Sequence, residues 1–308
     1  MQQLPERQVN DAEAFEALRP RLIRIAYRMT GLHAEAEDIV QDAWLRWNAT
    51  DKDTIRSPEA WLVRVVSHLT LDHLKSARVR RESYPGMWLP EPLVEEEEDR
   101  SDDITLTLML ALDRLSPLER AAFLLHDVFD MDFEEIGRVL DRDSAACRQL
   151  ASRARRHVRQ EKPRFTLPED RGRTIAEAFF QASRSGDMTA LQGLLAEDAV
   201  IYSDGGGIRN AALNPIVGRD KIMRFYEGIA RRADGIPPSI HQFAVFDGLP
   251  GHMSVEADGL PQVSAIELDG GLIRTIYLIR NPEKLRHLRM ADVETSPGFE
   301  SDQATSRT

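Results

Sequence analysis

The amino-acid sequence predicts a multi-domain protein in which two all-α domains precede an α+β domain. Apolar side chains recur at helical spacing throughout residues 11–84. Residues 116–159 carry the pattern of a helix-turn-helix. After residue 200 the pattern changes to short alternating runs separated by glycine-rich turns, which are typical of strands. Helices followed by consecutive strands favour an α+β domain with a curved sheet around a pocket. A chain of 308 residues has room for two or three domains.

The helix-turn-helix begins with a capping pattern, because Asp132 can cap a helix and Glu135 follows three residues later. Ser144 is the expected cap of the second helix. That helix has an inward stripe of small residues: Cys147, Ala151, Ala154 and Val158. Its other faces carry Arg148, Gln149, Ser152, Arg153, Arg155, Arg156 and Arg159. An ordinary amphipathic helix with a solvated face is the alternative. We favour a recognition helix in a DNA groove, since the charge is of one sign in an acidic chain.

Overall charge does not draw this chain to nucleic acid, because the formal net charge is −11 and the sequence pI is about 5.3. Any DNA contact must therefore be local. The single cysteine excludes an internal disulfide and a cysteine zinc cluster, and we expect it to be a buried small residue. We expect no metal, no cofactor and no catalytic residue. The N-terminus lacks a secretory signal and no run reaches membrane-spanning length, so we expect a cytoplasmic protein without a membrane partner.

The first domain should contain helices over Ala34–Trp47 and from Ser57-Pro58 onward, with Pro20 near the first turns of an earlier helix. Tyr84–Pro92 is expected to be extended because of its prolines, with Trp88 and Leu89 docked on another part of the chain and the acidic stretch to Asp103 mobile. The predicted divisions are a helical domain at 11–86, a linker at 87–103, the helix-turn-helix domain at 104–163, the α+β domain at 169–291 and a disordered tail at 292–308.

In the α+β domain, one helix face runs from Ile175 to Ala182 and a second from Met188 to Leu195, before a first strand at Val200–Ser203. Residues 219–232 predict a further helix. Strands are expected at 241–246, 252–257, 262–268 and 272–280, the last two joined by a hairpin at 269–271. Side chains that could serve as a pocket acid or base are Asp204, His241, His252 and Glu267. Their spacing singles out no dyad.

Three stretches resemble the extracytoplasmic-function sigma factors. YRMTGLHAEAEDIVQDAWLRW (27–47) is similar to the region-2 helix that grips the RNA polymerase core, SPEAWLVRVVSHLTLDHLKSARVRRE (57–82) to the helix that reads the −10 element, and the helix-turn-helix to region 4, which reads the −35 element. WLPEP (88–92), DGGG (204–207) and NPEKL (281–285) resemble the sigma factors with a fused SnoaL-like domain. The resemblance implies a cone-shaped SnoaL/NTF2-like fold for the last domain, which would regulate the protein in place of a separate anti-sigma factor.

The resemblance also implies roles for individual residues. Core polymerase would be bound by Glu35, Asp38, Gln41 and Asp42. The −10 element would be contacted by His68, Asp72, Lys75, Arg78, Arg80 and Arg81. The −35 element would be contacted by Ser144, Arg148, Gln149, Ser152, Arg153, Arg155, Arg156 and Arg159. Regulatory interdomain contacts would involve Trp88, Leu89, Pro90, Asp204, Gly205, Gly206, Gly207, Asn281 and Pro282. Trp44, Trp47 and Trp61 are expected in the core rather than stacked on bases.

The function expected on these grounds is that of a promoter-specificity subunit, which is not an enzyme. Its partners would be RNA polymerase core and promoter DNA, and a small molecule could fill the pocket of the last domain. We hypothesise that this domain holds region 2 against region 4 in the free protein. Two alternatives stay open: a SnoaL-like enzyme tethered to DNA, which would need a pocket acid or base of shifted pKa, and a transcription regulator gated by a small ligand.

Overall fold

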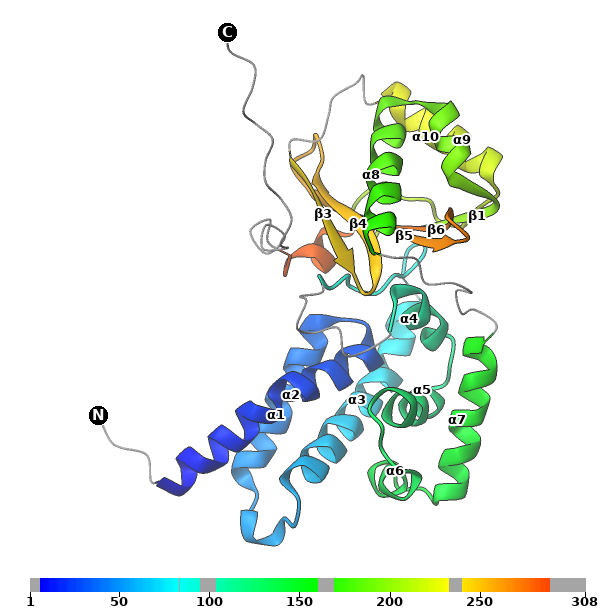
Figure 1. The fold of residues 1–308 in the computed structure, drawn as a ribbon. Helices are drawn as coiled ribbons and strands as arrows, with labels where there is room; N and C mark the ends of the chain where they lie inside the picture. Colours follow the sequence, from blue (N-terminus) through cyan, green and yellow to red (C-terminus); the bar gives the residue numbers. More distant parts are fainter. Residues whose placement is uncertain (1–5, 83, 95–103, 160–168, 233–239, 289–308) are drawn as a thin grey trace, which may run out of the picture. The chain divides into compact units, whose positions relative to one another are not determined.

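The computed structural model describes residues 6–82, 84–94, 104–159, 169–232 and 240–288 (Figure 1). It forms two compact units. The first contains Met1–Ser83 and Thr107–Lys162, and the second contains Tyr84–Leu106 and Pro163–Thr308. The predicted tail at 292–308, the linker residues 95–103 and the segment 163–168 lie outside the described residues. The fold class predicted from the sequence is confirmed, since a helical unit is followed by an α+β unit.

The described residues of the first unit form helices joined by short loops. Its described elements are α1 (Glu6–Thr30), α2 (His33–Ala49), η1 (Lys52–Thr54), α3 (Pro58–Glu82), α4 (Leu106–Asp113), α5 (Pro117–Phe123), the π-helical turn η3 (Leu124–Val128), α6 (Phe133–Leu140) and α7 (Ser144–Arg159). Ser57 caps α3 as predicted, accepting a bond from the amide of Ala60 at 3.3 Å. The placement of Pro20 near the first turns was wrong. α1 begins at Glu6, and Pro20 lies inside it. Pro20 has no N–H to donate, and the packing of α1 on α2 and α3 keeps the helix continuous past it.

The two halves of the first unit pack on each other. α5 and η3 contact α1, and α6 contacts α3. Arg120 of α5 is 5% exposed and donates to the backbone oxygen of Met29 at the end of α1 and to Asp113. Arg28 donates to the sulfur of Met109 at 3.3 Å. The carbonyl groups at the end of a helix need donors, so Arg120 stabilises the end of α1 as well as the seam.

The second unit is a six-stranded sheet in the order β2-β1-β6-β5-β4-β3, in which only the β1–β6 pair is parallel. Its elements are α8 (Glu169–Ser185), α9 (Met188–Leu194), β1 (Leu195–Asp204), β2 (Ile216–Val217), α10 (Arg219–Arg232), β3 (Ile240–Phe246), β4 (Leu249–Val255), β5 (Pro261–Asp269), β6 (Leu272–Ile279) and η4 (Pro282–Leu285). α8 packs on β4 and β5, and α10 packs on β1 and β2, so the helices cover one face of the sheet.

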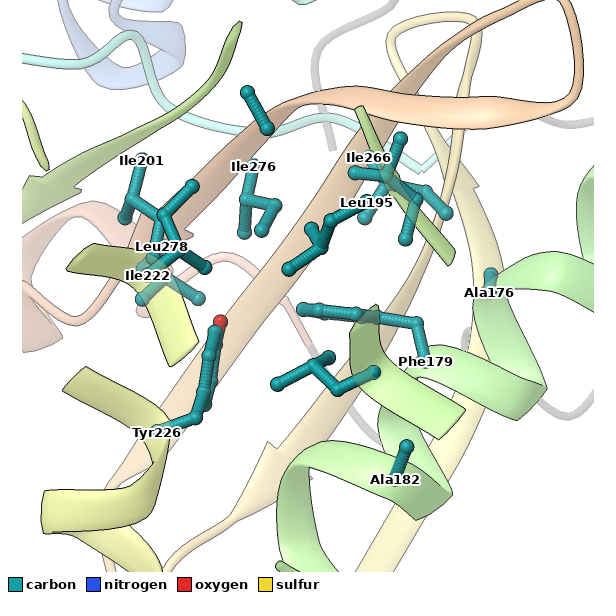
Figure 2. Packing of buried hydrophobic residues seen from close by; sticks show 13 residues of the cluster. Ala176, Phe179, Ala182, Leu195, Ile201, Ile222, Tyr226, Ile266, Ile276 and Leu278 are labelled. Carbon is teal, nitrogen blue, oxygen red and sulfur yellow. The ribbon is translucent and has the colours of Figure 1, made fainter. Parts of the chain in front are cut away.

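Apolar side chains fill the space between this face and the helices (Figure 2). Phe179 of α8 meets Tyr226 of α10 edge to face, with ring centroids 5.6 Å apart. Leu195 belongs to the same cluster, but its predicted place on a helix face was wrong. Its backbone is extended (φ −94°, ψ 135°) and it begins β1. A leucine is buried equally well at the end of the helix or at the start of the strand, so hydrophobicity alone does not distinguish the two assignments.

A hairpin turn at Asp247-Gly248 was missed in the sequence. Both residues have positive φ (43° and 70°), as this two-residue turn requires. β4 therefore begins at Leu249, three residues before the predicted strand. The predicted hairpin at residues 269–271 is confirmed. The expectation that the acidic stretch is mobile was wrong for its first residues, since Glu91 is 7% exposed and Val94 forms a bridge with Phe246. Prolines and apolar neighbours in this stretch favour docking over solvation of its acids.

Candidate functional site

The helix-turn-helix has the predicted geometry with one correction. Asp132 caps α6 by accepting the Glu135 amide at 2.7 Å, and Asp141 makes the left-handed turn at φ 51°. The cap of α7 is Asp143, which accepts the Ala146 amide at 2.6 Å. The predicted cap, Ser144, is the first residue of the helix and accepts instead from Arg148. Because the carboxylate of Asp143 already accepts the Ala146 amide in the first turn, the helix does not need Ser144 as its cap.

The small-residue stripe of α7 is buried, with Cys147, Ala151 and Ala154 at 0% exposure and Val158 at 2%. Burial raises the pKa of the Cys147 thiol, in keeping with a packing role. The outward face leaves five predicted DNA contacts exposed: Arg148, Gln149, Ser152, Arg153 and Arg156. Arg155 is half-buried and pairs with Asp127 at 2.8 Å. The side chain of Arg159 lies outside the described residues. α7 thus presents polar and cationic groups on one solvent face.

A polar face of α2 surrounds an exposed leucine. Asp38, Gln41 and Asp42 are all exposed, and Leu45 lies on the same face with 57% of its surface exposed. Glu35 differs from the other predicted residues because its carboxylate is 20% exposed and pairs with His73 of α3 at 2.8 Å. Leu45 was missed in the sequence, although it stands out of phase with the buried stripe of this helix. An apolar side chain ringed by carboxylates and an amide is suited to anchoring a basic partner surface.

Trp47 is buried in the core of the first unit, as predicted, whereas Trp44 and Trp61 are half-buried beside it. The indole of Trp47 donates to the backbone oxygen of Asp11 at 3.0 Å and lies 5.6 Å from the ring of Trp61. Trp44 packs against Phe15 with ring centroids 4.7 Å apart. Rings fixed in this way are not available to stack on bases.

The face of α3 with the predicted −10 contacts is partly covered by the helix-turn-helix. His68 contacts the backbone oxygen of Val139 and lies 3.5 Å from the carboxylate of Asp141, which also accepts from Arg64 at 2.9 Å. Asp72 is exposed, and its hydrogen bond from Lys75 lowers the pKa of its carboxyl. The side chains of Arg78, Arg80 and Arg81 lie outside the described residues. Region 4 therefore occupies one side of the surface that the sequence assigns to DNA.

A cavity of about 450 Å³ opens at the same seam. It is lined from α3 by His68, Leu71, Asp72 and Lys75, and on the other side by residues that begin α5 and end α6.

The three motifs of the second unit converge on one buried carboxylate. Asp204 is 0% exposed. One of its oxygens accepts from the Tyr84 hydroxyl at 2.7 Å and from the Gly206 amide at 2.9 Å. The other accepts from the Leu89 amide at 2.9 Å and from the Lys284 ammonium at 2.8 Å. Every contact is made within the second unit, because Tyr84–Leu106 belongs to it. We call these five residues the linker clasp.

Lys284 is the cation of the linker clasp, with its side chain 5% exposed. It also donates to the backbone oxygen of Leu89 and lies over the rings of Trp88 and Tyr84, at 4.3 and 4.9 Å from their centroids. Burial, and then the hydrogen bond to Asp204, raise the pKa of the Tyr84 hydroxyl. Such a charge pair is tolerated in an interior because hydrogen bonds complete it on both sides.

The remaining predicted interdomain residues surround the clasp. Asn281 is 3% exposed, accepts from the Glu283 amide and donates to the Tyr84 hydroxyl at 2.9 Å. Pro282 begins η4, and Pro90 is buried beside Leu89. Sequence analysis singled out NPEKL as a motif but did not identify Lys284 within it as the partner of Asp204.

Each glycine after Asp204 stands where a side chain would collide. A Cβ on Gly205 would lie 2.1 Å from the backbone oxygen of Arg209. One on Gly206, which has φ of +65°, would lie 2.4 Å from the side chain of Asn281. One on Gly207, which has φ of +72°, would lie 2.6 Å from Pro85 of the linker. The DGGG motif is therefore a close-packing surface for the linker and for η4.

A second anchor of the linker was missed in the sequence. Asp247 is 0% exposed, and its carboxylate accepts from the Leu93 amide at 3.0 Å. Its own amide donates to the Leu93 oxygen at 3.0 Å, and its oxygen accepts from the Leu106 amide at 3.1 Å. Residues 93 and 106 are therefore fixed at the same point. An Asp-Gly pair between two apolar runs identifies a hairpin turn, but nothing in the sequence shows that a linker binds there.

The candidate acids and bases do not assemble into one site. Asp204 belongs to the linker clasp, and Glu267 accepts from Thr275 at 2.7 Å. His252 is paired with Ser264 across the sheet, so it lies on the opposite face from Glu267. His241 and His252 both stack on Phe180, with ring centroids at 4.8 and 4.5 Å. Burial, and then the charge of His241, lower the pKa of His252 to about 4. The shifted pKa of His252 therefore accompanies an aromatic stack, and no carboxylate of the described residues contributes to the shift.

No helix in the described part of the chain is long and apolar enough to cross a membrane. The same residues contain no group of three side chains suited to holding a metal ion.

Comparison with known proteins identifies both halves of the first unit. Residues 14–80 match the family model of sigma-70 region 2, and residues 105–158 match that of sigma-70 region 4. The chain is 37% identical over 290 residues to the ECF RNA polymerase sigma factor SigJ of Mycobacterium tuberculosis, covering 89% of this chain and 93% of the relative. It is 29% identical to the probable ECF RNA polymerase sigma factor SigI of that species, and the match covers 90% of this chain and 95% of SigI. The crystal structure of SigJ superposes with a TM-score of 0.73 at 36% identity, over 89% of this chain and 98% of SigJ.

Removing the cation of the linker clasp should destabilise the second unit strongly. In Lys284→Met the buried carboxylate of Asp204 loses its partner, which costs roughly 3–5 kcal/mol of unfolding free energy. Urea denaturation would measure this loss, and proteolysis within residues 84–94 would become faster. The control is Glu283→Gln, which removes an exposed pair with Arg286 and should cost less than about 1 kcal/mol. Equal effects of both variants would contradict a buried clasp.

The depressed pKa of His252 predicts a loss of stability in mild acid. The unfolded chain binds a proton near pH 6.5, whereas the folded chain does so only near pH 4. Unfolding therefore becomes easier as the pH falls through this window, by on the order of 2–3 kcal/mol. Denaturation of His252→Gln at several pH values should show a shallower dependence than that of the wild type. His157→Gln, at an exposed position on α7, should keep the wild-type slope. Identical slopes for all three proteins would refute the assignment.

Proposed function

The chain belongs to the ECF RNA polymerase sigma factors, and on that premise we propose that its C-terminal unit controls promoter recognition by holding the linker between regions 2 and 4. The protein directs RNA polymerase core to promoters and initiates transcription. The observation that carries the proposal is the convergence of Tyr84, Leu89 and Leu93 on two buried aspartates of the C-terminal unit.

The length of the linker limits how far region 4 can move from region 2. Residues 83–105 connect α3 to α4, and about 23 extended residues span roughly 80 Å. Sites at −10 and −35 are roughly 25 base pairs apart, which is roughly 85 Å at 3.4 Å per pair. With residues 93 and 106 both fixed at Asp247, the segment between them adds almost nothing to that reach. Reading both elements together therefore requires release of the linker.

The roles of the surface residues follow from exposure and chemistry. The α2 face of Asp38, Gln41, Asp42 and Leu45 would bind core polymerase, with Glu35 supporting α3 through His73. α3 would contact the −10 element and α7 the −35 element. The contact of His68 and Arg64 with Asp141 supports a free state in which region 4 partly covers the −10 surface. Binding of core would favour the separated state by its greater affinity for that state.

The proposal also covers the need for an anti-sigma factor, the cellular compartment and the domain boundaries. A chain with its own regulatory unit would not require a separate anti-sigma factor. It would act in the cytoplasm, where its polymerase acts. Region 2 would be a functional domain at 11–86, region 4 at 104–163 and the regulatory SnoaL-like domain at 169–291. A small molecule could bind the last domain. Transcription by the purified chain with core alone would support independence from other proteins.

Substitutions on α2 should weaken binding to core polymerase. Leu45→Ala removes the apolar anchor, which is typically worth about 1–2 kcal/mol and so roughly 5- to 30-fold in affinity. Asp42→Lys places a cation against the expected basic surface and should weaken binding at least as much. Glu13→Lys makes the same charge change at an exposed position on a different helix, α1, and serves as the control. Binding can be measured by fluorescence anisotropy. Wild-type affinity in Leu45→Ala and Asp42→Lys would place the core contact elsewhere.

Releasing the second anchor should change transcription without changing core affinity. In Asp247→Ala the linker loses its side-chain acceptor at Leu93, so the two regions separate at lower cost. We expect more run-off transcript from promoters selected from a random library, measured with purified core. Asp220→Ala, an exposed acidic residue on α10, is the control. If transcript levels from Asp247→Ala and wild type are equal while both proteins fold, the linker does not limit initiation.

A further inference from the structure

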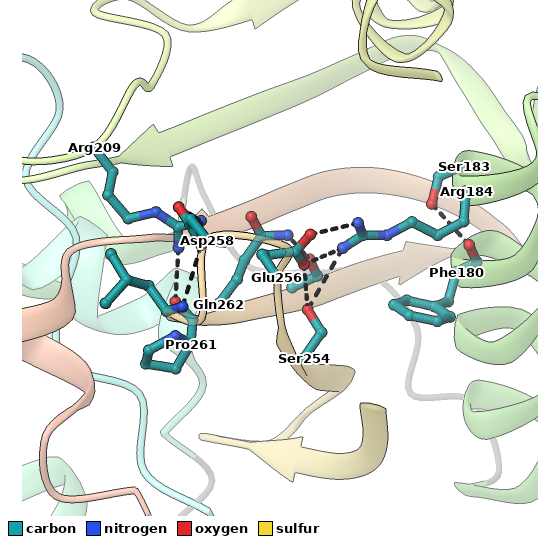
Figure 3. Close-up of polar contacts among 11 residues, drawn as sticks. Phe180, Ser183, Arg184, Arg209, Ser254, Glu256, Asp258, Pro261 and Gln262 are labelled. Atoms are coloured by element: carbon teal, nitrogen blue, oxygen red, sulfur yellow. Dashed lines mark hydrogen bonds and ion pairs between the residues drawn. The ribbon is translucent and has the colours of Figure 1, made fainter. Parts of the chain in front are cut away.

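Three arginines of the C-terminal unit lie near the ends of its elements: Arg184 at the end of α8, Arg209 in the loop after β1 and Arg280 directly after β6. Figure 3 shows the first two with their partners. Two of them are neutralised. Arg184 binds both oxygens of Glu256, one at 2.6 Å. Arg209 pairs with Asp258 at 2.9 Å and donates to the backbone oxygen of Pro261 at 2.9 Å. Burial raises the pKa of the Glu256 carboxyl, but the hydrogen bonds from Arg184 and Ser254 and the charges of Arg184 and Arg209 together lower the pKa overall.

Arg280 is the third arginine, and it is not neutralised. Its guanidinium donates to the backbone oxygen of Asn210. Its Nε is buried and has no hydrogen-bond partner within the described residues. No salt bridge joins Arg280 to a carboxylate of those residues. Burial, and then the charge of Arg209, lower the pKa of Arg280, as expected for neighbouring cations. Glu256 and Asp258 are thus paired with Arg184 and Arg209, while Arg280 is half-buried and keeps an unpartnered Nε within the described residues.

A half-buried guanidinium that has no carboxylate partner is unfavourable unless an anion joins it. The donors of Arg209 are taken by Asp258 and the Pro261 oxygen, whereas the Nε of Arg280 has no partner within the described residues. A guanidinium matches the two oxygens of a carboxylate or the several oxygens of a phosphate. We propose that Arg280, held against the end of the loop that carries Arg209 and Asn210, is the centre of a binding site for the oxyanion group of a small molecule, a carboxylate or a phosphate. Arg184 shapes the site through its pair with Glu256.

The site is connected to the linker clasp through the backbone. The amides of Arg280 and Asn281 both donate to the backbone oxygen of Asp204, at 2.7 and 3.0 Å. The loop after Asp204 continues to Arg209 and Asn210, so its beginning holds the linker and its end holds the arginines. An oxyanion on Arg280 would fix both ends of this loop, strengthen the clasp and reduce transcription. This coupling rests on the proposed function, whereas the binding site does not.

The site is tested by binding to the full chain. Inorganic phosphate and succinate would each be titrated by isothermal calorimetry at constant ionic strength, with sodium chloride as the blank. We expect saturable binding of at least one probe, and the tighter probe identifies phosphate or carboxylate as the preferred group. Arg280→Gln should weaken it at least tenfold. Arg286→Gln, an exposed arginine six residues later, should bind as the wild type does.

Absence of saturable binding to the wild type, or equal binding by Arg280→Gln, would overturn the site. Circular dichroism would verify folding, and Arg280→Lys provides a second variant that keeps the charge but loses the forked donors, so it too should bind more weakly. Run-off transcription with the bound probe should fall in the wild type but not in Arg280→Gln. Binding without any change in transcription would overturn the coupling. A chain that binds the probe but never initiates transcription would instead contradict the proposed function.

Discussion

The buried pair of Asp204 and Lys284 is the interaction on which the organisation of the C-terminal unit depends. A carboxylate with no exposed surface must receive hydrogen bonds for nearly all of its lone pairs, and here the donors come from the linker, the glycine loop and η4. No one segment can supply them alone. The charge therefore makes docking of the linker a condition for satisfying the interior of the domain.

The same constraint explains the sequence of the surrounding motifs. The glycines after Asp204 leave room for Asn281 and Pro85, where a Cβ would collide. Trp88 and Tyr84 enclose the ammonium of Lys284, which protects the pair from water. A clasp made of charge and close packing holds strongly when complete and weakly once a partner is missing. That property suits the proposed function, in which the contact releases as a whole when polymerase binds.

Helices and docked segments could be predicted where residues close together in the sequence carry the signal. The recognition helix was identified by its cap positions and by the period of Cys147, Ala151 and Ala154, and the docking of Leu89 by its hydrophobicity in a proline-rich segment. Pairings between distant residues were not predictable. Nothing near Asp247 indicates that Leu93 and Leu106 bind it, and the cover of His68 by Asp141 depends on how two helical regions pack.

If the linker limits the separation of regions 2 and 4, releasing it must lengthen the distance between them. Spin labels at Ala49 and Ala145, which are both exposed, would report the separation by double electron–electron resonance in the free chain and with core polymerase. The account predicts one short distance in the free wild type, a longer one with core, and a shift towards the longer distance in free Lys284→Met and Asp247→Ala. A distance that is unchanged by either substitution would contradict the account.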